Sequence, residues 1–280
     1  MKIAITGATG FIGFHVRRRL ALTDNKIVLG VRDLKRIGDL NINETPIEMD
    51  ISQEETNWFE ILGKPDVVLH LAWGGLPNYM DLVHVHFELP MQIKFLRGLV
   101  SSGLSKLVVT GTCYEYGPAN GALSEDHVTN PNTSYGVAKD LIRQELVALQ
   151  LTQKFELTWA RIFYPFGQGQ SGLSLYSQLT NCAKSKNGEL EIGNPQSVLD
   201  FVPVEDVAFA LSKFVEQKIG VGVINLGSGV PTSVEDFVQK LIAQHKWQVR
   251  IKYGSEGKRN FEPKAFWADA SKLQEFLSRI

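Results

Sequence analysis

The sequence predicts an α/β fold built on a doubly wound parallel sheet, followed by a smaller C-terminal α/β region. Two observations predict it. Short β-rich runs alternate with longer amphipathic segments from the first residue onward. Most of these runs are continuously apolar, as expected for strands that helices cover on both faces.

The elements follow one another in a regular order. Six runs are predicted strands, at residues 2–6, 26–31, 46–49, 67–71, 106–110 and 157–162. Helical periodicity predicts helices over residues 12–22, 54–62, about 81–102 and 134–151. Loop-forming residues then cluster at Pro165, Gly167, Gly169 and Gly172. We therefore expect a first domain over residues 1–165 and a second region over residues 166–280, with elements that cross between them.

The second region has shorter elements than the first. Its helices are expected near residues 173–186, 204–217, 234–245 and 270–277, with short strands between them.

Composition excludes several classes of protein. The 280 residues include 29 basic and 30 acidic side chains, and a net charge of -1 argues against a nucleic-acid partner or an anionic membrane. Cys113 and Cys182 are too few for a disulfide scaffold and are not spaced as metal ligands. No apolar run is long enough to span a membrane, and the first residues do not form a signal peptide. We expect a cytoplasmic protein.

A glycine-rich turn lies between the first strand and the first helix. Gly7, Gly10 and Gly13 are spaced as G-x-x-G-x-x-G. In a Rossmann dinucleotide site the first glycine permits a tight turn, the second lets the backbone approach a pyrophosphate, and the third allows close helix packing. A flexible turn is the alternative for the triplet alone. Its position favours a dinucleotide site formed by Gly7, Gly10, Phe11, Ile12 and Gly13.

Further motifs follow in a specific order along nearly the whole chain. They are Asp50-Ile51, His70-Leu71-Ala72, Tyr135-Gly136-Val137-Ala138-Lys139, Arg161-Ile162-Phe163-Tyr164-Pro165, Asp200 to Asp206, and Asn225 to Gly229. With the glycine turn they resemble the extended short-chain dehydrogenases/reductases, also called the NAD-dependent epimerase/dehydratase family. Within that family the chain resembles nucleoside-diphosphate 4-keto-6-deoxysugar reductases.

The resemblance implies that the two regions bind different molecules. Residues 1–165 would bind the dinucleotide, and residues 166–280 would close over a nucleotide sugar. Asp50 and Ile51 would meet the adenine, although Asp50 also suits a helix N-cap or turn. Leu71 and Ala72 would lie along the cofactor, or they pack only at the strand end. The other cofactor contacts implied are Trp73, Tyr135, Lys139, Tyr164 and Pro165.

Three residues are expected to form the catalytic site. Tyr135 and Lys139 are four residues apart on a predicted helix, so their side chains share one face. A nearby ammonium lowers the pKa of a tyrosine toward neutrality, which suits acid-base catalysis. Tyr-x-x-x-Lys is also frequent in ordinary helices. Thr112 makes the set specific, because it begins the family's Ser/Thr-x-x-x-Tyr-Gly segment and its hydroxyl would polarise a substrate carbonyl.

The residues after Thr112 discriminate among reactions. The related 4,6-dehydratases have an Asp-Glu pair there, whereas this chain has Cys113 and Tyr114, so dehydration is disfavoured. Cys113 is expected as a buried small residue rather than a nucleophile. The substrate contacts expected are Trp73, Asn78, Tyr79, Thr112, Cys113, Tyr114, Tyr164 and Arg259.

The diphosphate site departs from the family pattern. Leu199 stands where relatives have an arginine, so another cation must neutralise the phosphates. Arg259 is our candidate, and a solvated loop charge is its alternative. No metal site is expected, because His84 and His86 do not share a helix face and no motif joins them to His70.

The end of the second strand suggests the cofactor. Arg32, Lys35 and Arg36 place cations where a 2′-phosphate would bind, which favours NADPH over NAD. Asp33 opposes this, because it could take the ribose hydroxyls of NAD instead.

Our first hypothesis is the NADPH-dependent reduction of a nucleoside-diphosphate 4-keto-6-deoxyhexose. The alternative is a nucleotide-sugar 4-epimerase that retains NAD, and a noncatalytic cofactor-binding scaffold represents a different class. The resemblance also implies a homodimer through the helices at residues 81–102 and 134–151.

Overall fold

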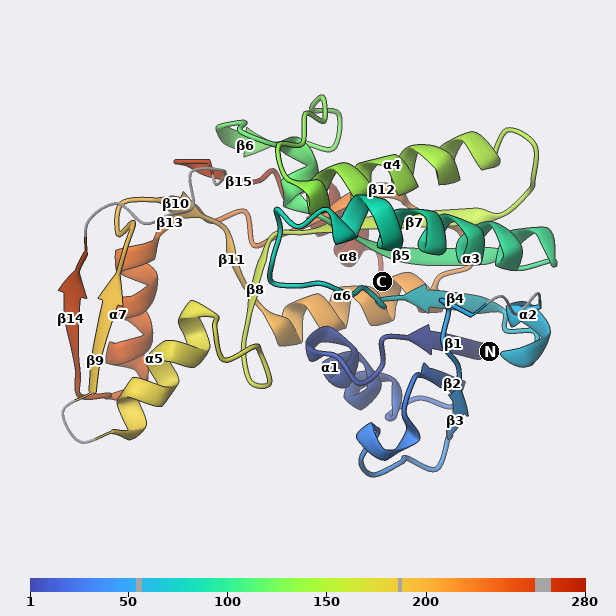
Figure 1. The fold of residues 1–280 in the computed structure, drawn as a ribbon, viewed down its shortest axis with the longest axis horizontal. Helices are drawn as coiled ribbons and strands as arrows, with labels where there is room; N and C mark the ends of the chain where they lie inside the picture. Colours follow the sequence, from blue (N-terminus) through green and yellow to red (C-terminus); the bar gives the residue numbers. More distant parts are fainter. Residues whose placement is uncertain (54–56, 186–187, 255–262) are drawn as a thin grey trace.

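A seven-stranded parallel sheet forms the centre of the molecule (Figure 1). The computed structural model describes residues 1–53, 57–185, 188–254 and 263–280. In spatial order the strands are β12 (Gly222–Leu226), β7 (Glu156–Ile162), β5 (Lys106–Thr112), β4 (Val67–His70), β1 (Lys2–Thr6), β2 (Lys26–Val31) and β3 (Glu44–Glu48). The chain runs outward from β1 in both directions, so β1 and β4 form the topological switch point where α/β sheets bind ligands.

Helices cover both faces of this sheet. One face carries α1 (Phe11–Leu20), α6 (Val204–Glu216) and α8 (Ser271–Ser278), and the other carries α2 (Trp58–Ile61), α3 (Leu89–Ser101) and α4 (Ser134–Leu149). Strand β1 shows why the apolar runs are continuous. Ile3 and Ile5 pack into the first layer and Ala4 into the second, and all three are fully buried.

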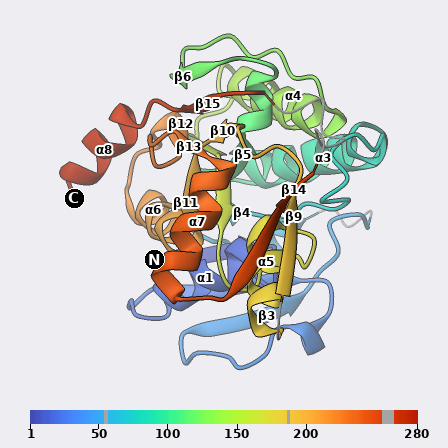
Figure 2. The same ribbon diagram turned by 90° about the vertical axis from the view of Figure 1, so that its left-hand side faces the viewer.

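Short paired strands and two further helices lie outside the main sheet (Figure 2). The pairs are β8 (Tyr164–Phe166) with β11 (Phe201–Pro203), β9 (Gly188–Ile192) with β14 (Val249–Tyr253), β10 (Val198–Leu199) with β13 (Thr232–Ser233), and β6 (Gly121–Leu123) with β15 (Phe266–Ala268). Helices α5 (Leu175–Lys184) and α7 (Val234–His245) pack against β9. Leu179, Leu190 and Phe237 belong to this second core.

The chain passes back and forth between the main sheet and the short paired strands. The chain beyond residue 165 returns to the main sheet as β12 and covers it with α6 and α8. Asp200 also ties two sequence motifs together. Its buried carboxylate accepts hydrogen bonds from the backbone N–H groups of Ser228, Gly229 and Ala268, at 2.7, 3.0 and 3.1 Å.

The six predicted strands are present, with ends that differ by at most two residues. The helix expected over residues 81–102 is different. It starts as a π-helical turn, η2 (His84–Glu88), and becomes α-helical at Leu89. In the preceding turn the Asp81 carboxylate accepts a hydrogen bond of 2.9 Å from the backbone N–H of Val83. Within the described residues, no helix is long and apolar enough to cross a membrane.

Candidate active site

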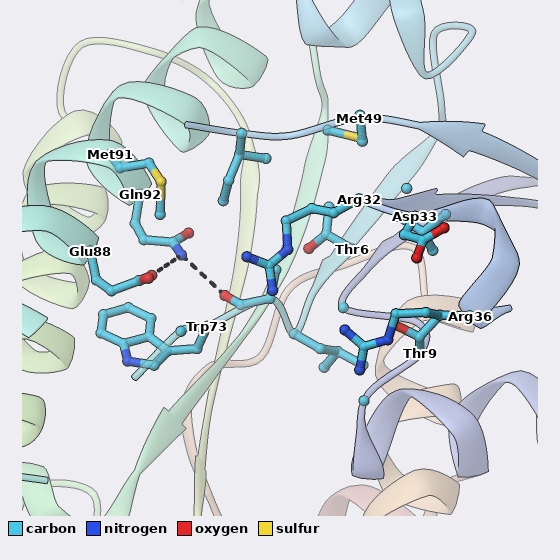
Figure 3. Close-up of a pocket in the computed structure, with 18 residues that line it drawn as sticks. Thr6, Thr9, Arg32, Asp33, Arg36, Met49, Trp73, Glu88, Met91 and Gln92 are labelled. Carbon is cyan, nitrogen blue, oxygen red and sulfur yellow. Dashed lines mark hydrogen bonds between the residues drawn. The ribbon is translucent and has the colours of Figure 1, made fainter. Parts of the chain in front are cut away.

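A pocket of about 280 Å³ opens at the carboxyl ends of the central strands (Figure 3). The glycine turn forms one wall. Gly7 has a φ of +72°, and a Cβ there would lie 2.7 Å from the backbone N of Ala72. A Cβ on Gly13 would lie 2.2 Å from the Gly7 carbonyl oxygen. Both positions therefore require glycine, and together they seat the N-terminus of α1 against the end of β1.

Arginine side chains form the wall at the end of β2. Figure 3 shows Arg32 extending into the pocket, with Arg36 beside Thr9. Asp33 also lines the pocket, but its carboxylate accepts a hydrogen bond of 3.0 Å from the backbone N–H of Lys35. Asp33 thereby caps the short 3-10 helix η1 (Leu34–Arg36). The arginines are the cationic groups of this wall.

A buried histidine, His70, supports the wall of the pocket that lies opposite the arginines. His70 Nδ1 accepts from the Thr6 hydroxyl at 2.7 Å, and its Nε2 donates to Gln92 Oε1 at 2.6 Å. Burial, followed by the charge of Lys139, lowers the pKa of His70 to about 3, so the ring is neutral. Gln92 in turn donates to the Ala72 carbonyl oxygen and to Glu88, as Figure 3 shows. This chain of bonds fixes the segment after β4.

The expected cofactor residues divide into two groups. Those that line the pocket are Gly7, Gly10, Arg32, Ile51, Leu71, Ala72 and Trp73. Those that do not are Phe11, Ile12, Gly13, Asp50, Tyr135, Lys139, Tyr164 and Pro165. Asp50 accepts from the backbone N–H of Ser52 at 3.0 Å, and this bond lowers the pKa of the Asp50 carboxyl. The turn contact of Asp50 is thus present, and its contact with the adenine stays a prediction.

Sequence patterns missed several pocket residues. Met49, Glu88, Met91 and Gln92 line the cavity. Met49 directly precedes the Asp50-Ile51 motif, which is a usable signal. The other three come from η2 and the start of α3, and no motif marked them.

Thr112, Tyr135 and Lys139 converge beside the pocket. Lys139 donates from Nζ to the Thr110 carbonyl oxygen at 2.8 Å, and its ammonium lies 4.1 Å from the centre of the Trp73 ring. Trp73 packs edge-on against Tyr135, with 5.5 Å between ring centres. The Thr112 side chain lies close enough to Tyr135 to lower its pKa, against the effect of burial. The three residues are buried and belong to β5 and α4.

The electrostatics of Tyr135 correct one expectation. We expected Lys139 to lower the pKa of Tyr135, but burial raises this pKa well above its ordinary value, and Tyr79 and Glu115 add to the rise. Burial lowers the pKa of Lys139 to about 7, against the opposing charges of Glu115 and Glu88. Desolvation penalises the charged form of each group and is the largest contribution to both shifts. Tyr135 is therefore protonated at neutral pH.

A cluster of aromatic rings extends from Tyr135. Tyr79 lies 5.7 Å from Tyr135 and 4.9 Å from Tyr114, and Tyr114 lies 6.2 Å from Tyr164, all between ring centres. His84 stacks on Trp73 and accepts a hydrogen bond from its indole N–H at 3.1 Å. Among the expected substrate residues, Trp73 and Tyr79 thus pack on Tyr135, and Tyr114 and Tyr164 extend the same cluster.

Asn78 and Cys113, which were also expected near the substrate, make other contacts. Asn78 donates to Asp81 at 3.2 Å in the loop after β4. Cys113 is buried among apolar side chains that include Phe163 and Phe266. Arg259 lies outside the described residues. Within the described part of the chain, no group of three or more His, Cys, Asp or Glu side chains is placed to hold a metal ion.

The fold and the site together define a class of protein. A glycine turn at the switch point of a doubly wound sheet, beside a buried threonine, tyrosine and lysine, is the arrangement of extended short-chain dehydrogenases/reductases. Residues 3–227 match the family described as "NAD dependent epimerase/dehydratase family". The chain belongs to this family.

Similar proteins agree with this assignment. The chain is 26% identical over 271 residues to a dTDP-6-deoxy-L-talose 4-dehydrogenase (NAD(+)) of Aggregatibacter actinomycetemcomitans, covering 95% of this chain and 99% of the relative. It is 24% identical to a UDP-glucose 4-epimerase of Neisseria meningitidis serogroup C, covering 96% and 89%. The structure of MoeE5 in complex with UDP-glucuronic acid and NAD superposes with a TM-score of 0.85 at 25% identity, covering 99% of this chain and 93% of MoeE5.

Proposed function

We propose that this enzyme oxidises and reduces C4 of a nucleotide-linked hexose with the help of a nicotinamide dinucleotide. The convergence of Thr112, Tyr135 and Lys139 beside the glycine-turn pocket carries the proposal. Relatives along nearly the whole chain are named as 4-dehydrogenases and 4-epimerases of nucleotide sugars, which supports C4 as the reacting carbon.

The pocket residues fit the cofactor. The glycine turn leaves the backbone at the N-terminus of α1 clear of side chains, which suits a pyrophosphate. Met49 and Ile51 offer apolar contacts for the adenine, and Trp73 lies at the end of the pocket nearest Lys139. When bound, the dinucleotide supplies a hydride acceptor and donor.

The residues of this chain would handle the proton and the oxygen at C4. Tyr135 holds a proton at neutral pH and would give it to the C4 oxygen during reduction, or receive it during oxidation. The Thr112 hydroxyl would donate a hydrogen bond to the same oxygen. Lys139 would carry positive charge near Tyr135, and the surrounding rings of Trp73 and Tyr79 would exclude water.

Two net reactions use this C4 step. A 4-epimerase oxidises and re-reduces its substrate on a retained cofactor, and most of the named relatives are 4-epimerases. This is the reaction that the comparisons favour. A 4-ketoreductase performs one half of it, and it is the reverse of the 4-dehydrogenase reaction for which two relatives are named.

The cofactor separates the two net reactions. NAD is the cofactor named for one curated relative and for several structural neighbours, which favours the retained NAD of an epimerase. The pocket supports the other reading, because Arg32 and Arg36 line it while the Asp33 carboxylate caps η1. A cationic wall favours the 2′-phosphate of NADPH and a net reductase.

A single assay tests the function. The protein is incubated with CDP-, dTDP-, UDP- and GDP-linked hexoses and 4-keto hexoses, and products are followed by NMR together with the absorbance of reduced nicotinamide. A reductase consumes NADPH in proportion to product, whereas an epimerase inverts C4 without net consumption. Failure of every nucleotide sugar to react at C4 would refute the proposal.

The variant Tyr135→Phe tests the assigned proton donor. Phenylalanine keeps the ring that packs on Trp73 and removes only the hydroxyl. We expect kcat to fall by at least about 100-fold, while the Kd of the cofactor changes by less than about threefold. Turnover within a few-fold of the wild type would contradict the role.

A further inference from the structure

A buried ion pair lies directly behind the Thr112 turn. Glu115 follows β5 in the 3-10 helix η3 (Cys113–Tyr116), and its side chain is completely buried. Arg161 comes from the neighbouring strand β7 and is 2% exposed. Its Nε donates to Glu115 Oε2 at 2.7 Å. The expected site residues do not include this pair, although both members lie in the motifs of the sequence.

The carboxylate of Glu115 is fixed from several sides. Oε1 accepts from the backbone N–H of Thr112 at 2.8 Å, and the Trp159 indole N–H lies within 3.1 Å of both oxygens. Burial raises the pKa of the Glu115 carboxyl, while Arg161 and the two N–H donors oppose the rise. Arg161 also donates to the Tyr116 hydroxyl at 3.0 Å. A second arginine, Arg143 of α4, lies 3.9 Å from Glu115 Oε2. These contacts hold the carboxylate directly behind the turn that carries Thr112.

The space between Gly111, Trp159 and the Glu115 carboxylate is too small for a side chain at position 111. A Cβ on Gly111 would lie 2.4 Å from Glu115 Oε1 and 2.2 Å from the Trp159 indole nitrogen. The residue before Thr112 must therefore be glycine for Glu115 to reach the Thr112 backbone. Glu115 thus shapes the backbone at the place where the hydroxyl of Thr112 is presented.

The same carboxylate acts on the charge of Lys139. The groups that face this ammonium are Glu115 from η3, Glu88 from η2, His70 from β4 and Tyr135 from α4. His70 is neutral, Tyr135 is protonated at neutral pH, and Glu115 contributes more than Glu88 to keeping Lys139 charged. A negative charge behind the Thr112 turn therefore favours the cationic form of the lysine.

We propose that Glu115 is a positioning residue, whose carboxylate, held by Arg161 and Trp159, fixes the Thr112 turn and maintains the positive charge of Lys139. This inference rests on the proposed roles of Thr112 and Lys139. Glu115 does not touch the reacting atoms. It acts on Thr112 through a hydrogen bond to the backbone and on Lys139 through its charge.

Two variants separate positioning from folding. Glu115→Gln keeps an oxygen that accepts from Thr112 but leaves the Arg161 charge buried without its counterion, which is destabilising. The double variant E115Q/R161Q removes both charges and is expected to regain much of the lost Tm. In both variants we expect kcat to fall at least about tenfold, with the KM of the cofactor within about threefold of the wild type.

The titration of Lys139 supplies a readout that needs no substrate. Lysine side-chain NMR of the protein, with Lys139→Met to assign the signal, follows its protonation. Loss of the Glu115 charge should lower the pKa of Lys139 in Glu115→Gln, and by less in the double variant, because that variant also loses the Arg161 cation. The high-pH limb of the kcat profile should move in the same direction.

A matched control is the other buried Arg–Glu pair. Arg17 of α1 donates to Glu44 from Nε and Nη2, at 3.0 and 2.8 Å. Glu44→Gln should lower the Tm and leave kcat and the Lys139 titration unchanged.

The inference is overturned if the double variant regains the wild-type kcat together with its Tm, or if Lys139 titrates at the wild-type pH in both variants. A wild-type protein that turns over no nucleotide sugar refutes the proposed function instead. The Lys139 titration then still tests the effect of Glu115.

Discussion

The contact between Gly13 and the glycine turn provides a quantitative test of the cofactor pocket. In Gly13→Ala the added methyl would lie 2.2 Å from the Gly7 carbonyl oxygen and 2.8 Å from the Ala8 Cα, whereas real Cβ contacts essentially never fall under 3.0 Å. Both neighbours are backbone atoms, so no side chain can rotate away. Helix α1 must therefore move off the turn by about 1 Å.

This movement has a cost for stability and for binding. Overpacking of a close contact destabilises by about 3 kcal/mol, which lowers the Tm of a protein of this size by about 6 °C. The displaced N-terminus of α1 would also present its N–H groups out of place to a pyrophosphate. We expect the Kd of the dinucleotide to rise at least about tenfold, equivalent to about 1.4 kcal/mol.

Calorimetry measures both quantities in one preparation, by thermal unfolding and by cofactor titration. Gly98→Ala in α3 is the matched control, because a Cβ there meets nothing within 4 Å. It should stabilise the protein by about 0.5 to 1 kcal/mol, the helix propensity gained, without changing the Kd. The reasoning is refuted if Gly13→Ala binds the dinucleotide as tightly as the wild type.

Three further predictions concern the cofactor, the pH dependence of stability and assembly. If Arg32 recognises a 2′-phosphate, the wild type binds NADPH at least about tenfold more tightly than NADH, and Arg32→Ala removes the difference; equal wild-type affinities would favour the epimerase. Burial lowers the pKa of Lys106 to about 8, so the unfolded chain binds more protons between pH 8 and pH 10.5, and stability should rise with pH across that window. Chemical denaturation should show this rise in the wild type and a smaller rise in Lys106→Met, in which Lys139, whose pKa is also lowered, still contributes. For assembly, light scattering at micromolar concentration should give the mass of a dimer, and a monomeric mass would reject the interface expected from residues 81–102 and 134–151.

Local patterns in the sequence determined the class of fold and much of the site. Continuous apolar runs such as residues 2–6 can be buried on both faces only within a helix-covered sheet, and β1 packs in that way. The glycine spacing specified a turn whose atoms lie too close for any side chain at Gly13. The spacing of Tyr135 and Lys139 specified a shared helix face. Each of these properties depends on neighbours within a few residues.

Long-range packing decided the rest. Strand β12 pairs with β7 across about sixty residues, and η2 and the start of α3 complete a pocket whose glycine turn is some eighty residues earlier. Glu115 meets Arg161 because their strands are neighbours in the sheet, although 46 positions separate them. The pKa of Tyr135 rises for the same kind of reason. Desolvation depends on everything packed around a side chain, and the spacing of Tyr135 from Lys139 reports only one of its neighbours.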